Sequence, residues 1–155
     1  MFRNRLLPTI CATVTAVLLA AGSAVAEPVQ SRALAAPPGV PVTFTANTTF
    51  EDPPEPDEFS GTIPGCTSGT VVDSGGGAVF TPWGGVFVGV KSFTCAGGEG
   101  GFDVRLRARF GESGSVGTWN IIDAWGTLDG LKGSGSLVGI PTENGIDDVY
   151  SGTLR

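Results

Sequence analysis

The sequence predicts an all-β fold built as a single antiparallel barrel of eight strands. Residues 42–155 are rich in glycine and β-branched residues, and no window of helical length keeps an apolar period of 3.6 residues without a glycine break. Short apolar segments alternate with short glycine-rich segments, which favours antiparallel neighbours joined by tight turns. Many short strands with such turns are typical of a sandwich or a closed barrel.

An N-terminal segment precedes the predicted domain. Residues 1–26 begin with Arg3 and Arg5, continue through an apolar run and end on a small-residue triplet, which is the pattern of a secretory signal peptide. The apolar run is too short and too often interrupted by threonine for a transmembrane helix. We therefore expect cleavage after Ala26, a secreted chain and no membrane insertion. Residues 27–41 are rich in proline and alanine, which predicts a flexible arm before the domain at 42–155.

The strongest strand signal is the segment 102–110. Its apolar residues, from Phe102 to Phe110, alternate strictly with charged residues, so one face should be buried and the other polar. The length of the region 42–155 fits one domain with one core. The eight predicted strands, in chain order, are residues 42–50, 69–73, 77–81, 85–95, 102–110, 117–123, 135–139 and 147–155.

Glycine-rich segments mark the predicted turns, at 73–77, 96–101, 111–115 and Asn144-Gly145. The longer glycine-rich stretch at 126–145 misses the dinucleotide-binding pattern by one residue and lacks the Gly-Lys-Ser/Thr of a Walker loop. A phosphate site also needs a helix N-terminus, whereas this stretch favours a strand and then a turn. We therefore expect its glycines to serve turns and close strand packing, with no cofactor bound.

Removal of the signal leaves two cysteines, Cys66 and Cys95, in a compartment that permits disulfides. Bridging this interval predicts a stabilisation of roughly 3–4 kcal/mol in the chain-entropy account. A reactive or metal-binding pair is the alternative, although no CxxC spacing supports it. An immunoglobulin-type sandwich would place a tryptophan soon after its first cysteine and the second cysteine far downstream. The cysteine spacing therefore favours the barrel.

The charge and composition exclude several functions. Without the two arginines of the signal, the chain has seven basic and 15 acidic residues. The resulting net charge of −8 disfavours nucleic acid as a partner. The chain has no histidine, which excludes histidine-based catalysis and His-rich metal sites. The acidic segment 51–58 is predicted to be a solvated loop; a calcium loop is the alternative, although the ligand pattern of an EF-hand is missing. We expect no bound metal.

Arg105, Arg107 and Arg109 share one face of the segment 102–110. We predict that this face points outward, because the opposite face carries the apolar residues that should line the core. The alternative is an inward arginine face that binds a carboxylate or sulfate. With the arginines outside, a ligand pocket within the barrel would be mostly apolar.

The candidate ligand-binding residues are Trp83, Phe87, Leu106 and Trp119. Such side chains either fill a small barrel or line one that keeps a cavity, and the interior of an eight-stranded barrel is just wide enough for side chains to fill it. The first functional hypothesis is a non-enzymatic secreted barrel that binds a small apolar ligand or presents its loops to an extracellular protein. It is motivated by the signal, the cysteine pair, the small size and the lack of a catalytic constellation.

The C-terminal part of the chain resembles a known family. The segment "GTWNIIDAWGTLDGLKGSGSLVG" (117–139), followed by "DDVYSGTL" (147–154), is similar to the C-terminal half of the allene oxide cyclase barrel-like proteins. These include plant dirigent proteins and small secreted bacterial relatives. The resemblance implies an eight-stranded antiparallel barrel and identifies no active-site residue in this chain. It is carried by Gly126, Gly130, Leu131, Gly133 and Gly135, with Trp119 and Tyr150 beside them.

The resemblance to cyclase-type barrels also suggests an alternative function. A cyclase- or isomerase-like enzyme would steer a hydrophobic substrate by the shape of its cavity, and it would need one buried carboxylate or tyrosine with a perturbed pKa. The candidates are Asp123, Asp148 and Tyr150; the competing interpretation places each at a turn or on the surface. A buried carboxylate at Asp123 would favour the enzyme, and a filled interior would exclude it.

Overall fold

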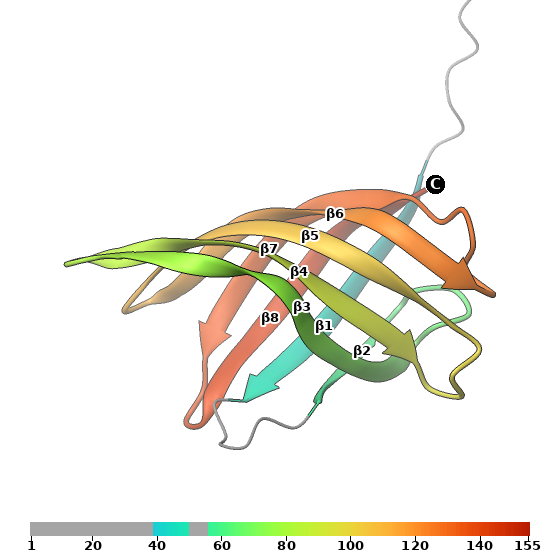
Figure 1. The fold of residues 1–155 in the computed structure, drawn as a ribbon, viewed down its shortest axis with the longest axis horizontal. Coiled ribbons are helices and arrows are strands. Elements are labelled where there is room, and N and C mark those ends of the chain that lie inside the picture. The colour runs from blue at the N-terminus through green and yellow to red at the C-terminus, as the bar shows by residue number, and fades with distance from the viewer. Residues whose placement is uncertain (1–38, 50–55) are drawn as a thin grey trace, which may run out of the picture. The chain divides into compact units, whose positions relative to one another are not determined.

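The structure is a computed structural model that describes residues 39–49 and 56–155, and these residues form a closed antiparallel β-barrel (Figure 1). Each strand pairs with its neighbours in the chain, and the first strand pairs with the last, which confirms the predicted fold class. The strands are β1 (Val40–Thr49), β2 (Asp57–Gly61), β3 (Ser68–Thr81), β4 (Gly84–Cys95), β5 (Gly100–Gly111), β6 (Gly114–Gly126), β7 (Gly133–Pro141) and β8 (Gly145–Leu154).

The predicted N-terminal segments lie almost wholly outside the described residues. The signal peptide at 1–26 is not among them, and of the arm at 27–41 only the last three residues are. Two of these three already belong to the barrel, because β1 begins at Val40 and pairs with β8 from its first residue. The strand therefore begins two residues before the predicted domain boundary at Val42.

Two of the predicted strands are one. The segments 69–73 and 77–81 belong to the continuous strand β3, and the turn predicted at 73–77 is wrong. A register shift between Asp73 and Gly75 lets the glycines pass along β4 without reversing the chain. Gly76 has a φ of +117° and lies against the backbone of Gly89, a position where a side chain would meet both strain and a clash.

The barrel still has eight strands, because β2, which is not among the predicted strands, is one of them. Asp57–Gly61 overlaps the predicted acidic loop at 51–58, so Asp57 and Glu58 are strand residues. The segment shows little alternation of apolar and polar residues, since Phe59 is its one large apolar residue. Phe59 is also its one buried side chain. It pairs on both sides, with β1 and β3, which closes the barrel. The strand count of eight is correct, but its members differ from those predicted.

Strand β5 behaves as its alternation predicts. Its apolar residues from Phe102 to Ala108 are buried inside the barrel, whereas Arg105, Arg107 and Arg109 are exposed. The outward orientation of the three arginines is therefore confirmed.

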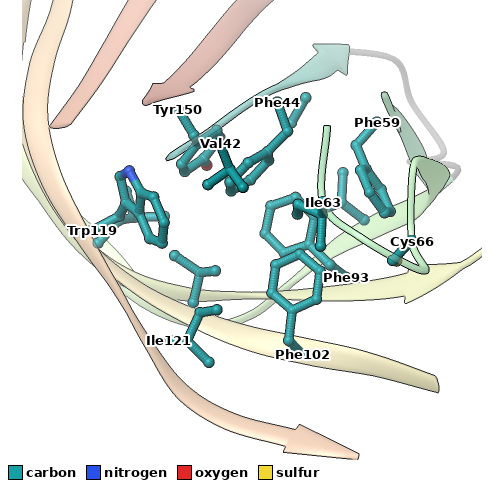
Figure 2. Close-up of a cluster of buried hydrophobic side chains, with 14 of the residues drawn as sticks. Val42, Phe44, Phe59, Ile63, Cys66, Phe93, Phe102, Trp119, Ile121 and Tyr150 are labelled. Carbon is teal, nitrogen blue, oxygen red and sulfur yellow. The ribbon is translucent and has the colours of Figure 1, made fainter. Parts of the chain in front are cut away.

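An aromatic cluster fills one end of the barrel (Figure 2). Phe44 stacks on Tyr150 with ring centroids 4.5 Å apart, and Phe93 stacks on Phe102 at 4.9 Å. Edge-to-face contacts connect these two pairs, for example Phe44 with Phe93 at 5.5 Å. The loop between β2 and β3 adds buried Ile63 to the same cluster. We call this the closed end; its members are Phe44, Phe59, Ile63, Phe93, Phe102, Trp119 and Tyr150.

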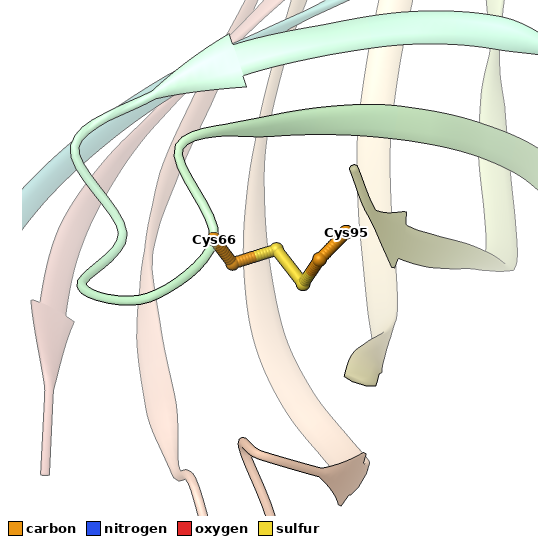
Figure 3. Close-up of a disulfide and its surroundings, with 2 residues drawn as sticks. All are labelled: Cys66 and Cys95. Atoms are coloured by element: carbon orange, nitrogen blue, oxygen red, sulfur yellow. A yellow bond between two sulfur atoms is a disulfide. The ribbon is translucent and has the colours of Figure 1, made fainter. Parts of the chain in front are cut away.

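The disulfide joins the closed end to the loop that covers it (Figure 3). Cys66 lies in the loop between β2 and β3, Cys95 is the last residue of β4, and their Cα atoms are 5.2 Å apart. The predicted pairing is therefore confirmed. Such a bond indicates that the protein folds in an oxidising compartment.

Removing the disulfide should cost a large part of the stability. We expect the double variant Cys66→Ser, Cys95→Ser to lose about 3 kcal/mol of unfolding free energy, because the open loop regains chain entropy in the unfolded state. Urea unfolding of the oxidised wild type and the variant measures the difference. The reduced wild type is the control and should unfold like the double variant; an unchanged midpoint in both would contradict this account.

Candidate ligand cavity

A cavity of about 310 Å³ opens at the end of the barrel opposite the closed end. The order of residues along the strands shows this position. Strands β4 and β8 reach the cavity residues first and the aromatic cluster afterwards, whereas β5, which is antiparallel to β4, reaches the cluster first. Seven strands contribute to the lining, which consists of Thr48, Asp73, Phe80, Phe87, Lys91, Leu106, Ala108, Phe110, Ser115, Leu137, Ile146 and Asp148. The interior is thus filled at one end and hollow at the other.

Apolar side chains form most of the cavity wall. Phe87 and Leu106, two of the four predicted ligand-binding residues, lie in it together with Leu137 and Ile146. These residues come from four different strands, whose inward positions meet at the same depth of the barrel. A largely apolar wall with a few polar groups is typical of sites for small molecules.

The two predicted tryptophans lie elsewhere. Trp83 is 92% exposed in the turn between β3 and β4. Trp119 is buried in the closed end, and its Nε1–H donates to the backbone oxygens of Ser136 at 3.0 Å and Ser151 at 3.3 Å. The structure therefore brings Phe87 and Leu106 together in the cavity, and places neither tryptophan in its lining.

Lys91 brings a positive charge into the cavity. Its side chain is only 6% exposed, and its ammonium Nζ lies 3.2 Å from a carboxylate oxygen of Asp73 and donates to Thr48 Oγ1 at 3.2 Å. A buried ammonium is tolerated where a counter-charge and hydrogen bonds replace its lost water. The sequence carries a signal for this residue, because Lys91 has the same strand parity as Phe87 and Phe93 and so faces inward with them.

Asp148 and Ser115 meet at the polar side of the cavity. Gly139 of β7 pairs with Ser115 on one side and with Asp148 on the other. A Cβ atom at position 139 would lie against Ser115 Oγ and 2.9 Å from Asp148 Oδ1. The missing side chain of Gly139 therefore leaves the space in which these two polar groups converge.

The environment of Asp148 makes its carboxyl group weakly acidic. The residue is 7% exposed, and burial raises its pKa from 3.8 to about 6. The charge of Lys91 opposes this shift, whereas the carboxylates of Asp73, Asp57 and Asp147 add to it. Of the three predicted catalytic candidates, Asp148 is the one that lines the cavity.

The other two candidates do not reach the cavity lining. Asp123 is exposed on β6, where it pairs with Asp103 next to a register shift. Tyr150 is buried in the closed end, and burial followed by the charge of Asp148 raises its pKa well above 10. Its hydroxyl finds no hydrogen-bond partner among residues 39–49 and 56–155.

The orphaned hydroxyl of Tyr150 predicts a stabilising substitution. We expect Tyr150→Phe to raise the unfolding free energy by about 1 kcal/mol, because a buried hydroxyl without a partner costs about 1–3 kcal/mol and the ring contacts are kept. Thermal unfolding of the two proteins measures the change. A loss of stability would show that the hydroxyl is bonded in solution, for instance to a buried water.

The fold and site together define a closed eight-stranded antiparallel barrel with one filled end and one open, mainly apolar cavity. No protein-family model, curated protein or solved structure matches the chain. The similarity to allene oxide cyclase barrel-like proteins stays a prediction. In the two described ranges, no three His, Cys, Asp or Glu side chains are grouped so as to hold a metal ion. The same part of the chain contains no helix that is long and apolar enough to cross a membrane.

Proposed function

We propose that this protein is a secreted, non-enzymatic barrel that binds a small, largely apolar ligand in its open cavity. The observation that carries the proposal is the cavity itself. An eight-stranded barrel can be filled by its own side chains, yet here about 310 Å³ between Phe87, Leu106 and Leu137 is left open. That volume lies at the lower end of the range for small-molecule sites.

Secretion is part of the same proposal. The charged start, apolar run and small-residue triplet of residues 1–26 support a signal peptide that is cleaved after Ala26. The disulfide between Cys66 and Cys95 supports an oxidising, extracellular destination. N-terminal sequencing of the protein from culture medium tests this part, with Glu27 as the expected first residue.

Filling the cavity should weaken the binding of an apolar probe. We expect the neutral fluorophore N-phenylnaphthylamine to bind the wild type, and Ala108→Trp to weaken it at least about tenfold, because Ala108 lies in the wall and an indole there occupies the space of the probe. Fluorescence titration measures both affinities. Ala108→Leu, which adds less volume, should show a smaller loss and serves if the tryptophan variant does not fold.

The control places the same substitution outside the cavity. Ala96 is exposed in the turn between β4 and β5, at the closed end, so Ala96→Trp should bind the probe like the wild type. Equal affinity of all three variants would mean that the probe binds to the surface, and the proposal would then be wrong.

One observation favours the enzymatic alternative. Asp148 is a buried carboxyl group in an apolar cavity, the arrangement in which a side chain can exchange protons with a substrate near neutral pH. Chromatography and NMR of a ligand recovered after long incubation separate the two functions. An unchanged ligand supports binding alone, and an isomer that forms with the wild type but not with Asp148→Asn supports a cyclase- or isomerase-like enzyme.

A further inference from the structure

We infer that the cavity selects a ligand with an apolar body and a protonated amine, and that Asp148 accepts the hydrogen bonds of that ammonium group. The inference rests on the proposed function and names the class of ligand. It is carried by the position of one carboxylate, by the charges around it and by the apolar wall beside it.

Asp148 presents a largely buried carboxyl group to the cavity. It lines the cavity with 7% of its surface exposed. Within residues 39–49 and 56–155, neither a hydrogen bond nor an ion pair reaches its carboxylate, although Lys91 lies near enough to influence its charge. A carboxylate that has lost most of its water in an apolar cavity costs free energy that a ligand N–H can recover. The empty space in front of it is the cavity itself.

The surrounding charges favour a cation over an anion. The charged groups that shift the pKa of Asp148 are Lys91 of β4, Asp73 of β3, Asp57 of β2 and Asp147 of β8. The charge of Asp148 in turn raises the pKa of Tyr150. The charges of three carboxylates and of one ammonium thus act on Asp148. Lys91 already binds Asp73 and Thr48, so an anionic ligand would meet an occupied cation and an unpaired carboxylate.

A neutral hydroxyl would satisfy Asp148 less well than an ammonium. Both groups can donate a hydrogen bond to the carboxylate, but the ammonium adds the attraction between opposite charges, and the apolar wall of Leu106, Leu137 and Ile146 keeps water from weakening that attraction. The same wall accepts the hydrocarbon body of the ligand. The ligand class that fits both the carboxylate and the apolar wall is therefore a small lipophilic amine.

The pairing requires Asp148 to be ionised. Because its pKa is about 6, about nine tenths of the carboxyl groups are ionised at pH 7 and about one tenth at pH 5. Affinity for the amine should therefore fall about tenfold between pH 7 and pH 5. Over this range the amine itself stays protonated, so the decrease reports on the protein.

Three probes with one body and different head groups test the inference. We would titrate 4-phenylbutylamine, 4-phenylbutanol and 4-phenylbutyrate into the wild type by calorimetry at pH 7.5. The amine is expected to bind at least about tenfold more tightly than the alcohol, and the carboxylate more weakly than both. Asp148→Asn should remove the advantage of the amine, whereas Asp123→Asn, the same change on an exposed residue, should keep it.

The outcomes separate this inference from the function on which it rests. If the alcohol or the carboxylate binds as tightly as the amine, or if Asp148→Asn keeps the preference, selection of amines is wrong while the cavity function stands. The same holds if N-phenylnaphthylamine binds in the cavity and none of the three probes does. If that fluorophore also fails to distinguish the wild type from Ala108→Trp, the proposed function fails too.

Discussion

Asp148→Asn is expected to stabilise the barrel by up to about 3 kcal/mol at pH 8 and by less than about 1 kcal/mol at pH 4. The carboxyl group has a pKa of about 6 in the folded state against 3.8 when exposed, so the folded protein holds this proton more tightly. Near pH 3 the group is protonated in both states and costs nothing. As the pH rises through 4 to 6, the unfolded state loses the proton first and the wild type loses stability; asparagine avoids this loss.

Urea unfolding at both pH values measures this effect. Asp123→Asn serves as the control, because Asp123 is exposed, and it should change the unfolding free energy little at either pH. A loss of stability in Asp148→Asn at pH 8 would show that the ionised carboxylate has a partner in the folded protein. That result would remove the basis for a free acceptor in the cavity.

Phe93→Ala is expected to destabilise the protein by about 3–5 kcal/mol, close to the whole stability of a small domain. Phe93 is fully buried, stacks on Phe102 and makes edge-to-face contacts with Phe44, Phe59 and Tyr150 at centroid distances of 5.2–5.8 Å. Thermal unfolding should show a large loss or no cooperative transition at all.

Phe80→Ala is the matched control. Phe80 lies at the mouth of the cavity, is 76% exposed and contacts one other ring, that of Phe110 at 5.5 Å. The same loss of a phenyl ring should therefore cost less than about 1 kcal/mol here. Equal losses at positions 80 and 93 would contradict the division of the barrel into a filled end and an open one.

The sequence predicts the fold class well where alternation is strong. In β5 every second residue is apolar, and the buried and exposed faces follow from that pattern alone. The glycines at 73–77 misled the prediction because glycine permits both a turn and a bulged strand, and pairing with β4 decides between them. The sequence does not predict strand β2, because Phe59 is its one strongly apolar inward residue. The strand is held by backbone pairing with β1 and β3, which the sequence pattern does not reveal.

The candidate site is less accessible to sequence reasoning. Phe87 and Leu106 follow from residue type and parity. Lys91 has the same parity signal, but lysine is rarely buried unless it is paired, so its residue type argues against an inward position. Trp119 is buried in the closed end rather than in the cavity lining, because alternation indicates which way a side chain points and not how far along the barrel it lies. The convergence of Ser115 and Asp148 around Gly139 depends on the register of three strands, which the sequence does not specify.

Ligand binding inside the open cavity is tested most directly by locating a bound apolar molecule by NMR. With methyl groups labelled, nuclear Overhauser effects from N-phenylnaphthylamine should reach the inward methyls of Leu106, Leu137 and Ile146, which line the cavity. The exposed methyls of Val79 and Val116 should receive none. Contacts confined to those outer valines, or none to the inward methyls at a probe concentration that saturates the fluorescence, would contradict the claim that this barrel binds small apolar ligands in its open end.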